Sequence, residues 1–182
     1  MRQPMKLAER LAAKKSAIVK EWFDLVVATY PPDTSRFLKA QQDPFANPVG
    51  NSTLKGLQTA FDGLLRDAGD SARQQALDAI IRIRAVQDFT PAQATGFVLE
   101  LKPILRRVLR KELARPEAWE ELLELERRVD ILLLTAFDIY LRCRETLSQL
   151  KVDMETNRIH HAFARAGLVT ETPDAKPPPE TS

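Results

Sequence analysis

The stretch IIRIRAVQDFTP, residues 80–91, decides how this chain folds. Leu77, Ile80 and Arg84 follow one another at the spacing of one face of an α-helix, so Arg84 continues an apolar face that should be buried. Asp88 lies four residues after Arg84, within reach of an ion pair on the same helix. A buried charge without a partner is very costly. We therefore expect a fixed polar cluster inside the fold, formed by Arg82, Arg84 and Asp88.

The composition is that of an ordinary globular protein. The 182 residues are 44% hydrophobic and 29% charged, with a formal net charge of +2. This balance favours one folded domain and gives no general argument for nucleic-acid binding. The longest apolar segment of the C-terminal helix, residues 131–137, is far shorter than the roughly 20 residues that span a bilayer. Because the chain has a single cysteine, Cys143, and no apolar leader segment, we expect a cytoplasmic protein without a transmembrane segment.

The hydrophobic pattern predicts an all-α fold, a bundle of about five main helices. The connection over residues 31–51 is loop-rich, and Phe37, Leu38 and Phe45 are expected to pack it against the core. The helices are expected over residues 5–30, from Ser52 to near Gly69, from Asp70 or Ser71 through the arginine cluster, from Thr90 and Pro91 with a kink at Pro103, and from Pro116 to about residue 166.

The last expected helix has two parts. Between Val129 and Leu141 it is apolar nearly all round, which predicts burial. Beyond this part, a narrower apolar seam with the heptad step predicts a coiled-coil extension over residues 140–166 of a helical domain that covers residues 1–166. The residues proposed for a dimer interface along this seam are Tyr140, Leu147, Leu150, Met154 and Asn157. Residues 167–182 include three consecutive prolines and are expected to form a disordered tail.

The arginine cluster has two interpretations. In the first it is a ligand site for an anion or a carboxylate, to which Asn47 and Phe45 contribute from the preceding loop. In the second it is a buried ion pair that ties its helix to the loop carrying Asp43 and Asn47. The structural interpretation is favoured, because ion pairs also occur in cores without any ligand. The loop over residues 45–50 is equally ambiguous, since asparagine, glycine and proline give it its turns without a ligand.

No catalytic or metal site is expected. His160 and His161 lie on a polar helix, away from the apolar segments that a haem pocket requires. Cys143 has no histidine at helical spacing that could activate it as a nucleophile. The acidic residues at the start of the last helix suit the positive end of its dipole, and they lack the Glu-x-x-His signature of a di-iron bundle. We therefore expect no cofactor and no enzyme activity.

Two basic patches are expected, one along an edge of the first helix and one at the end of the fourth helix. They could contact phosphates or an acidic partner, but solubility and compensation of the helix dipole are favoured. Nucleic-acid binding is disfavoured because no aromatic residues alternate with the arginines and no helix-turn-helix spacing accompanies them. The two patches are Arg2, Lys6, Arg10 and Lys14, and Arg106, Arg107, Arg110, Lys111 and Arg115.

Several motifs between about residues 7 and 109 are similar to those of one family. They are KEWF at residues 20–23, YP at 30–31, FL at 37–38, DPFANPVG at 43–50 and IIRIRAVQDFTP at 80–91. Through them the chain resembles the RsbRD N-terminal domain family, the helical sensor-like domains at the front of RsbR-type antagonist proteins of bacterial stress signalling.

The resemblance implies a helical, non-haem, globin-like input module that forms a homodimer and passes a signal through its C-terminal helix. In multi-domain relatives that helix leads into a STAS output domain. No such domain follows here, so we expect the chain to act by docking onto another protein.

Two functional hypotheses remain open. The first is a non-catalytic regulatory or sensor domain that acts through contact with an unidentified protein partner, as a homodimer. The second is a helical protein that binds a small anionic or tetrapyrrole ligand through the arginine cluster.

Overall fold

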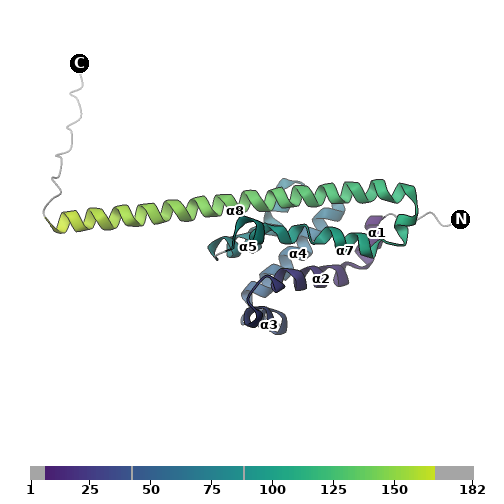
Figure 1. Cartoon of the computed structure of the whole chain (residues 1–182), viewed down its shortest axis with the longest axis horizontal. Coiled ribbons are helices and arrows are strands. Elements are labelled where there is room, and N and C mark those ends of the chain that lie inside the picture. Colours follow the sequence, from purple (N-terminus) through teal and green to yellow (C-terminus); the bar gives the residue numbers. More distant parts are fainter. Residues whose placement is uncertain (1–6, 42, 88, 167–182) are drawn as a thin grey trace, which may run out of the picture. The chain divides into compact units, whose positions relative to one another are not determined.

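The computed structural model describes residues 7–41, 43–87 and 89–166 of the chain. Every regular element in these residues is a helix, which confirms the predicted all-α fold (Figure 1). The elements in chain order are α1 (Leu7–Ala13), α2 (Lys15–Ala28), α3 (Pro32–Ala40), α4 (Pro48–Arg66), α5 (Asp70–Val86), α6 (Pro91–Thr95), the 3-10 helix η1 (Gly96–Val98), α7 (Leu101–Val108), the 3-10 helix η2 (Glu112–Ala114) and α8 (Pro116–Arg165).

The chain divides into two compact units, and α8 contributes to both. The N-terminal unit ends at Arg144, and the C-terminal unit begins at Glu145. Among the described helices, none combines the length and the apolar character that crossing a bilayer requires.

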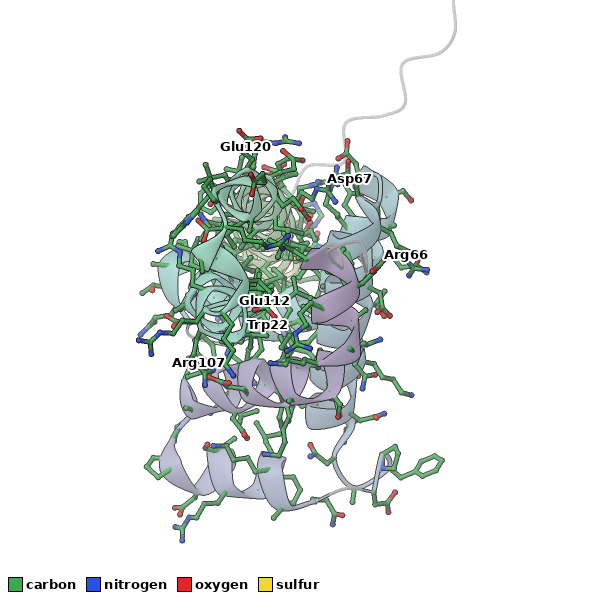
Figure 2. All side chains as sticks on the ribbon, turned by 90° about the vertical axis from the view of Figure 1, so that its right-hand side faces the viewer. Trp22, Arg66, Asp67, Arg107, Glu112 and Glu120 are labelled. Atoms are coloured by element: carbon green, nitrogen blue, oxygen red, sulfur yellow. The ribbon has the colours of Figure 1, made fainter. Side chains whose placement is uncertain are left out.

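The single helix predicted over residues 5–30 is two helices within the described residues. Lys14 leaves the helical conformation with φ −109° and ψ 10°, and its N–H donates to Leu11 O in a turn. Figure 2 shows α1 and α2 running in different directions. The periodicity did not reveal this break, because Leu11 and Ile18 are seven residues apart and keep helical spacing across it.

The connection predicted as a loop over residues 31–51 contains the helix α3. Pro32 is its first residue, where the missing N–H of proline would have no partner inside the helix. Leu38 is buried as predicted. Phe37 and Phe45 are 50% and 95% exposed, so the prediction that they pack against the core was wrong.

The helix α4 begins earlier than predicted, at Pro48, because Asn47 and not Ser52 is its N-cap. The Asn47 side chain accepts a hydrogen bond from the Gly50 N–H at 2.8 Å. The helix ends at Arg66, and Asp67 adopts a left-handed conformation with φ 53° as its C-cap. The next helix, α5, begins at Asp70 as predicted.

The predicted start of the fourth main helix is confirmed, but its kink lies elsewhere. Thr90 and Gln93 form a reciprocal capping box at the start of α6, with Pro91 as the first helical residue. The chain then changes to the 3-10 helix η1 before α7 begins at Leu101. Pro103 is the third residue of α7, where its lack of an N–H breaks no hydrogen bond within the helix.

The core of the N-terminal unit gathers side chains from α1, α2, α4, α5, α6, η1, α7 and α8. Trp22 lies in its interior (Figure 2), fully buried, and its indole N–H donates to Phe97 O at 2.7 Å. From α8 the core takes one face only, and the exposed fractions of Leu134, Phe137 and Leu141 are 64%, 40% and 39%. The prediction that α8 is buried all round between Val129 and Leu141 was therefore wrong.

Candidate functional site

Arg84 lies on the buried face of α5, as its spacing from Leu77 and Ile80 predicted. Its side chain has 0% exposure, which makes it one of the largest fully buried side chains of the protein. Ile80 and Ile81 precede it in the same core. The helix therefore carries a guanidinium group into a region that its other residues make apolar.

The guanidinium group of Arg84 is held by oxygen atoms of the protein. Nη1 donates to Gln93 O at 2.9 Å, and Nη2 donates to Val26 O at 3.0 Å and to Thr29 Oγ1 at 2.5 Å. These acceptors come from the end of α2 and from α6, so one side chain joins three helices. The Nε atom is buried, and no described residue accepts a hydrogen bond from it.

Three aromatic rings surround the same guanidinium group. Its central carbon lies 5.3 Å from the ring centroid of Tyr30, 4.8 Å from that of Phe89 and 5.1 Å from that of Phe97. At these distances a cation is attracted by the negative faces of the rings. We call Arg84 with these three rings the arginine cage.

The surroundings of Arg84 affect its ionisation. Burial lowers the pKa of Arg84, because removing the guanidinium from water disfavours its charged form. The hydrogen-bond acceptors at Val26, Thr29 and Gln93 are neutral oxygens. The predicted ion-pair partner, Asp88, lies outside the described residues, so the pair with Arg84 stays a prediction.

Arg82 is not part of the cage, which corrects the prediction that both arginines lie inside the core. Its side chain is 65% exposed and its Nε donates to Asp78 Oδ2 at 2.7 Å, an ordinary ion pair along the surface of α5. Arg82 precedes Arg84 by two residues, a rotation of about 200° around the helix, and this places it on the opposite face.

Asn47 is buried, but its contacts serve the loop between α3 and α4. Its Nδ2 donates to Leu38 O and to Gln41 O, both at 2.9 Å, while its Oδ1 caps α4. Phe45, in the same loop, is 95% exposed, and its N–H donates to Asp43 Oδ1 at 3.0 Å. The four described residues of the predicted ligand site are therefore not brought together: Arg84 is in the core, Arg82 and Phe45 are exposed, and Asn47 closes a loop.

Tyr140 was predicted as a dimer contact, but it belongs to the core. It is 4% exposed, and its hydroxyl donates to Phe89 O at 2.8 Å, next to the arginine cage. The rest of the predicted interface lies in the C-terminal unit. There Leu150 and Met154 are 53% and 71% exposed, Asn157 is exposed, and Leu147 is partly buried. These four residues, which we call the C-terminal seam, stay a prediction.

Two arginines of the second basic patch form ion pairs with other helices. Arg106 binds the nearly buried carboxylate of Glu126 with two hydrogen bonds, at 2.6 and 2.8 Å, and Arg107 pairs with Glu21. In the part of the chain that the structure describes, His, Cys, Asp and Glu side chains nowhere gather in threes that could hold a metal ion.

The sequence of the chain matches one known family. Residues 16–151 match the RsbT co-antagonist protein rsbRD N-terminal domain. The chain belongs to this family. Comparison with curated proteins and with solved structures found no match. The matched range of the rsbRD N-terminal domain contains α2 without its first residue, α3 to α7 with the whole arginine cage, and most of α8.

Sequence reasoning found Arg84 but missed most of its partners. Phe89 is part of the stretch that identified the cage, and Tyr30 was recognised only as an apolar residue of the first helix. The backbone acceptors at Val26 and Gln93 left no signal in the sequence, because any residue type provides a carbonyl oxygen. In this rsbRD N-terminal domain, these two carbonyl oxygens lie next to Arg84 only because α2 and α6 pack against α5.

Proposed function

We propose that this rsbRD N-terminal domain is a non-catalytic regulatory module that acts by binding other proteins and forms a homodimer through its C-terminal seam. The family is one of stress signalling, which supports a regulatory role. The observation that carries the protein-contact mechanism is the exposure of Leu150 and Met154, 53% and 71%, on a long helix of the C-terminal unit. Apolar residues at heptad spacing on such a helix favour pairing with another helix.

Sedimentation equilibrium of the full chain tests this proposal. The chain should sediment as a dimer, and the double variant Leu150→Lys, Met154→Lys should associate much more weakly, because two charges would face the partner helix. The matched control is Val152→Lys, Ile159→Lys, whose residues are 55% and 52% exposed on another face of the same helix. Equal effects of both double variants would contradict the C-terminal seam.

Ligand binding at the arginine cage is the second candidate function. The observation in its favour is that the buried Arg84 Nε has no acceptor among the described residues. Native mass spectrometry of protein purified from its own host tests it. A mass that is lost on denaturation, and that Arg84→Lys abolishes, would support a ligand; protein at its sequence mass would support the regulatory module alone.

A further inference from the structure

The first helix, α1, fills part of the core although it is short. It has seven residues, and its two leucines, Leu7 and Leu11, are 1% and 0% exposed. Both belong to the main core, together with side chains of α4 and α8. A helix of this length is marginal by itself, so the burial of its two leucines holds it in place. We call the surface that α1 covers the α1 site.

The helix α1 is separate from the rest of the fold. Lys14 leaves the helical conformation and ends α1 before α2 begins. The match to the rsbRD N-terminal domain begins at residue 16, so α1 lies before the part of the chain that the family model covers. The elements that contact α1, namely α4, η2 and the start of α8, lie inside the matched range. The α1 site therefore belongs to the matched domain, whereas its occupant does not.

The edge of the α1 site is acidic. Arg10 Nε lies 2.7 Å from Glu112 Oε1, and the Leu7 N–H donates to Glu121 Oε2 at 3.0 Å. Figure 2 shows Glu112 beside α1. Charges of opposite sign across an interface select a partner and its orientation. The α1 site is therefore complementary to a helix that carries positive charge next to two leucines.

The helix α1 satisfies this acidic edge incompletely. Although Arg10 Nε is close to Glu112 Oε1, the two atoms are not aligned as a hydrogen bond, and Nε is buried without an acceptor among the described residues. Glu112 Oε2 is buried as well, and no described residue donates to it. Buried polar atoms without partners destabilise the state that contains them. A helix whose arginine donated to both oxygens of Glu112 would therefore compete with α1.

We propose that the α1 site binds a basic amphipathic helix of another protein, and that α1 is an autoinhibitory segment that covers the site until this helix arrives. The partner helix has two leucines four residues apart and an arginine three residues after the first, as α1 has in Leu7, Arg10 and Leu11. This inference rests on the proposed function, a module that acts by binding other proteins, and names the chemistry of one partner. It involves no residue of the C-terminal seam.

A peptide with the sequence of α1 tests whether the site accepts a helix from another chain. The probe is the fluorescently labelled peptide MKLAERLAAKKS, residues 5–16, and fluorescence anisotropy measures its binding to full-length chains. In the double variant Leu7→Asp, Leu11→Asp, the chain's own α1 cannot cover the site, because two carboxylates would be buried without partners. This variant should bind the peptide at least about tenfold more tightly than the parent, in which the tethered α1 competes.

The matched control places the same two charges on the exposed side of α1. Ala12 and Ala13 are exposed, so Ala12→Asp, Ala13→Asp leaves the site covered and should bind the peptide no better than the parent. A peptide with the same residues in scrambled order should bind none of these chains. A folded Leu7→Asp, Leu11→Asp chain that does not bind the peptide, or equal binding by both double variants, would overturn the proposal.

A charge swap tests the acidic edge and keeps both leucines, so it also serves if the double aspartate variant does not fold. Arg10→Glu replaces the attraction to Glu112 with repulsion, and this full-length chain should bind the peptide more tightly than the parent. Adding Glu112→Arg restores an ion pair of reversed charge within the chain, and peptide binding should return to the level of the parent. Circular dichroism and Trp22 fluorescence show whether the chains are folded. Equal peptide binding by the parent and both variants would overturn the proposal.

Sedimentation equilibrium of the same chains separates this inference from the proposed function. Peptide binding by chains whose dimerisation ignores the C-terminal seam variants would reject the seam and keep the α1 site. An intact seam dimer that never binds the peptide would reject the α1 site alone. In chains carrying Leu150→Lys and Met154→Lys, a remaining dimer that the peptide dissociates would show that the site binds α1 of a second copy, which would overturn binding to another protein.

Discussion

Arg84 brings a positive charge into the core and joins three helices there. A lysine at this position would keep the charge but lose the planar group that donates to Val26 O, Gln93 O and Thr29 at the same time. The contacts to the rings of Tyr30, Phe89 and Phe97 would also weaken. At the scale of one residue, the cage therefore stabilises the fold through the geometry of the guanidinium as well as its charge.

We expect Arg84→Ala to lower the free energy of unfolding by about 3–5 kcal/mol, because it leaves buried acceptors unpaired and creates a cavity. Arg84→Lys should lose less. The matched control is Arg82→Ala on the same helix, which breaks an exposed ion pair and should cost no more than about 1 kcal/mol. Urea denaturation measures all three, and equal losses for Arg84→Ala and Arg82→Ala would contradict a structural role of the cage.

Glu124 provides a pH-dependent contact on α8. Hydrogen bonds from Arg127 and Arg128 lower the pKa of its carboxyl from 4.5 to about 2. The carboxylate therefore stabilises the folded protein above pH 4.5, and this contribution is lost as the pH falls towards 2. The effect is small, because the groups are exposed and solvent screens them.

In Glu124→Gln, the melting temperature should fall less steeply between pH 4.5 and 2 than in the parent protein. Circular dichroism melts at several pH values in this range measure the slope. Glu120→Gln, an exposed carboxylate one turn earlier, is the control. Parallel pH profiles of Glu124→Gln and the parent would show that this carboxylate makes no pH-dependent contribution.

At the scale of elements, α4 approaches α5 closely at Gly56. A Cβ atom added there would lie 2.7 Å from the backbone oxygen of Ala76 and 2.7 Å from Ile80 Cδ1. Glycine at this point allows the two helix backbones to approach, although it is a poor helix former. The position of α5, and with it that of the arginine cage, depends on this close contact.

Gly56→Ala should therefore lower the free energy of unfolding by about 1–3 kcal/mol, as overpacking does, despite the better helix propensity of alanine. Gly96→Ala is the control, because a Cβ there meets nothing within 4 Å. Chemical denaturation measures both variants. A Gly56→Ala protein as stable as the parent would show that α4 and α5 can move apart without a loss of stability.

At the scale of the whole molecule, the two units differ in what holds them together. The buried residues of the main core all belong to the N-terminal unit, the last of them being Tyr140. The described residues from Glu145 onwards are exposed apart from Leu147. The N-terminal unit thus contains its own core, whereas the helix of the C-terminal unit has its apolar side chains in water.

A chain that ends after Arg144 should therefore fold, with a cooperative thermal transition within a few degrees of that of the full chain. Circular dichroism and the fluorescence of the buried Trp22 measure this. A fragment that is unfolded or melts without cooperativity would show that the core requires residues beyond Arg144.

The sequence by itself determined the all-α class and the starts of α5, α6 and α8. These follow from local chemistry: helical spacing of apolar residues, a capping box at Thr90 and a proline at position 116. It also placed Arg84 on a buried face. The break at Lys14, the helix α3, the exposure of Phe45 and the two faces of α8 were decided only by tertiary structure. Periodicity shows that a residue is apolar, but whether that residue is covered depends on which distant helices pack against it. The backbone carbonyls that hold Arg84 are the clearest case, because their positions come from the meeting of α2, α5 and α6 and from no side chain.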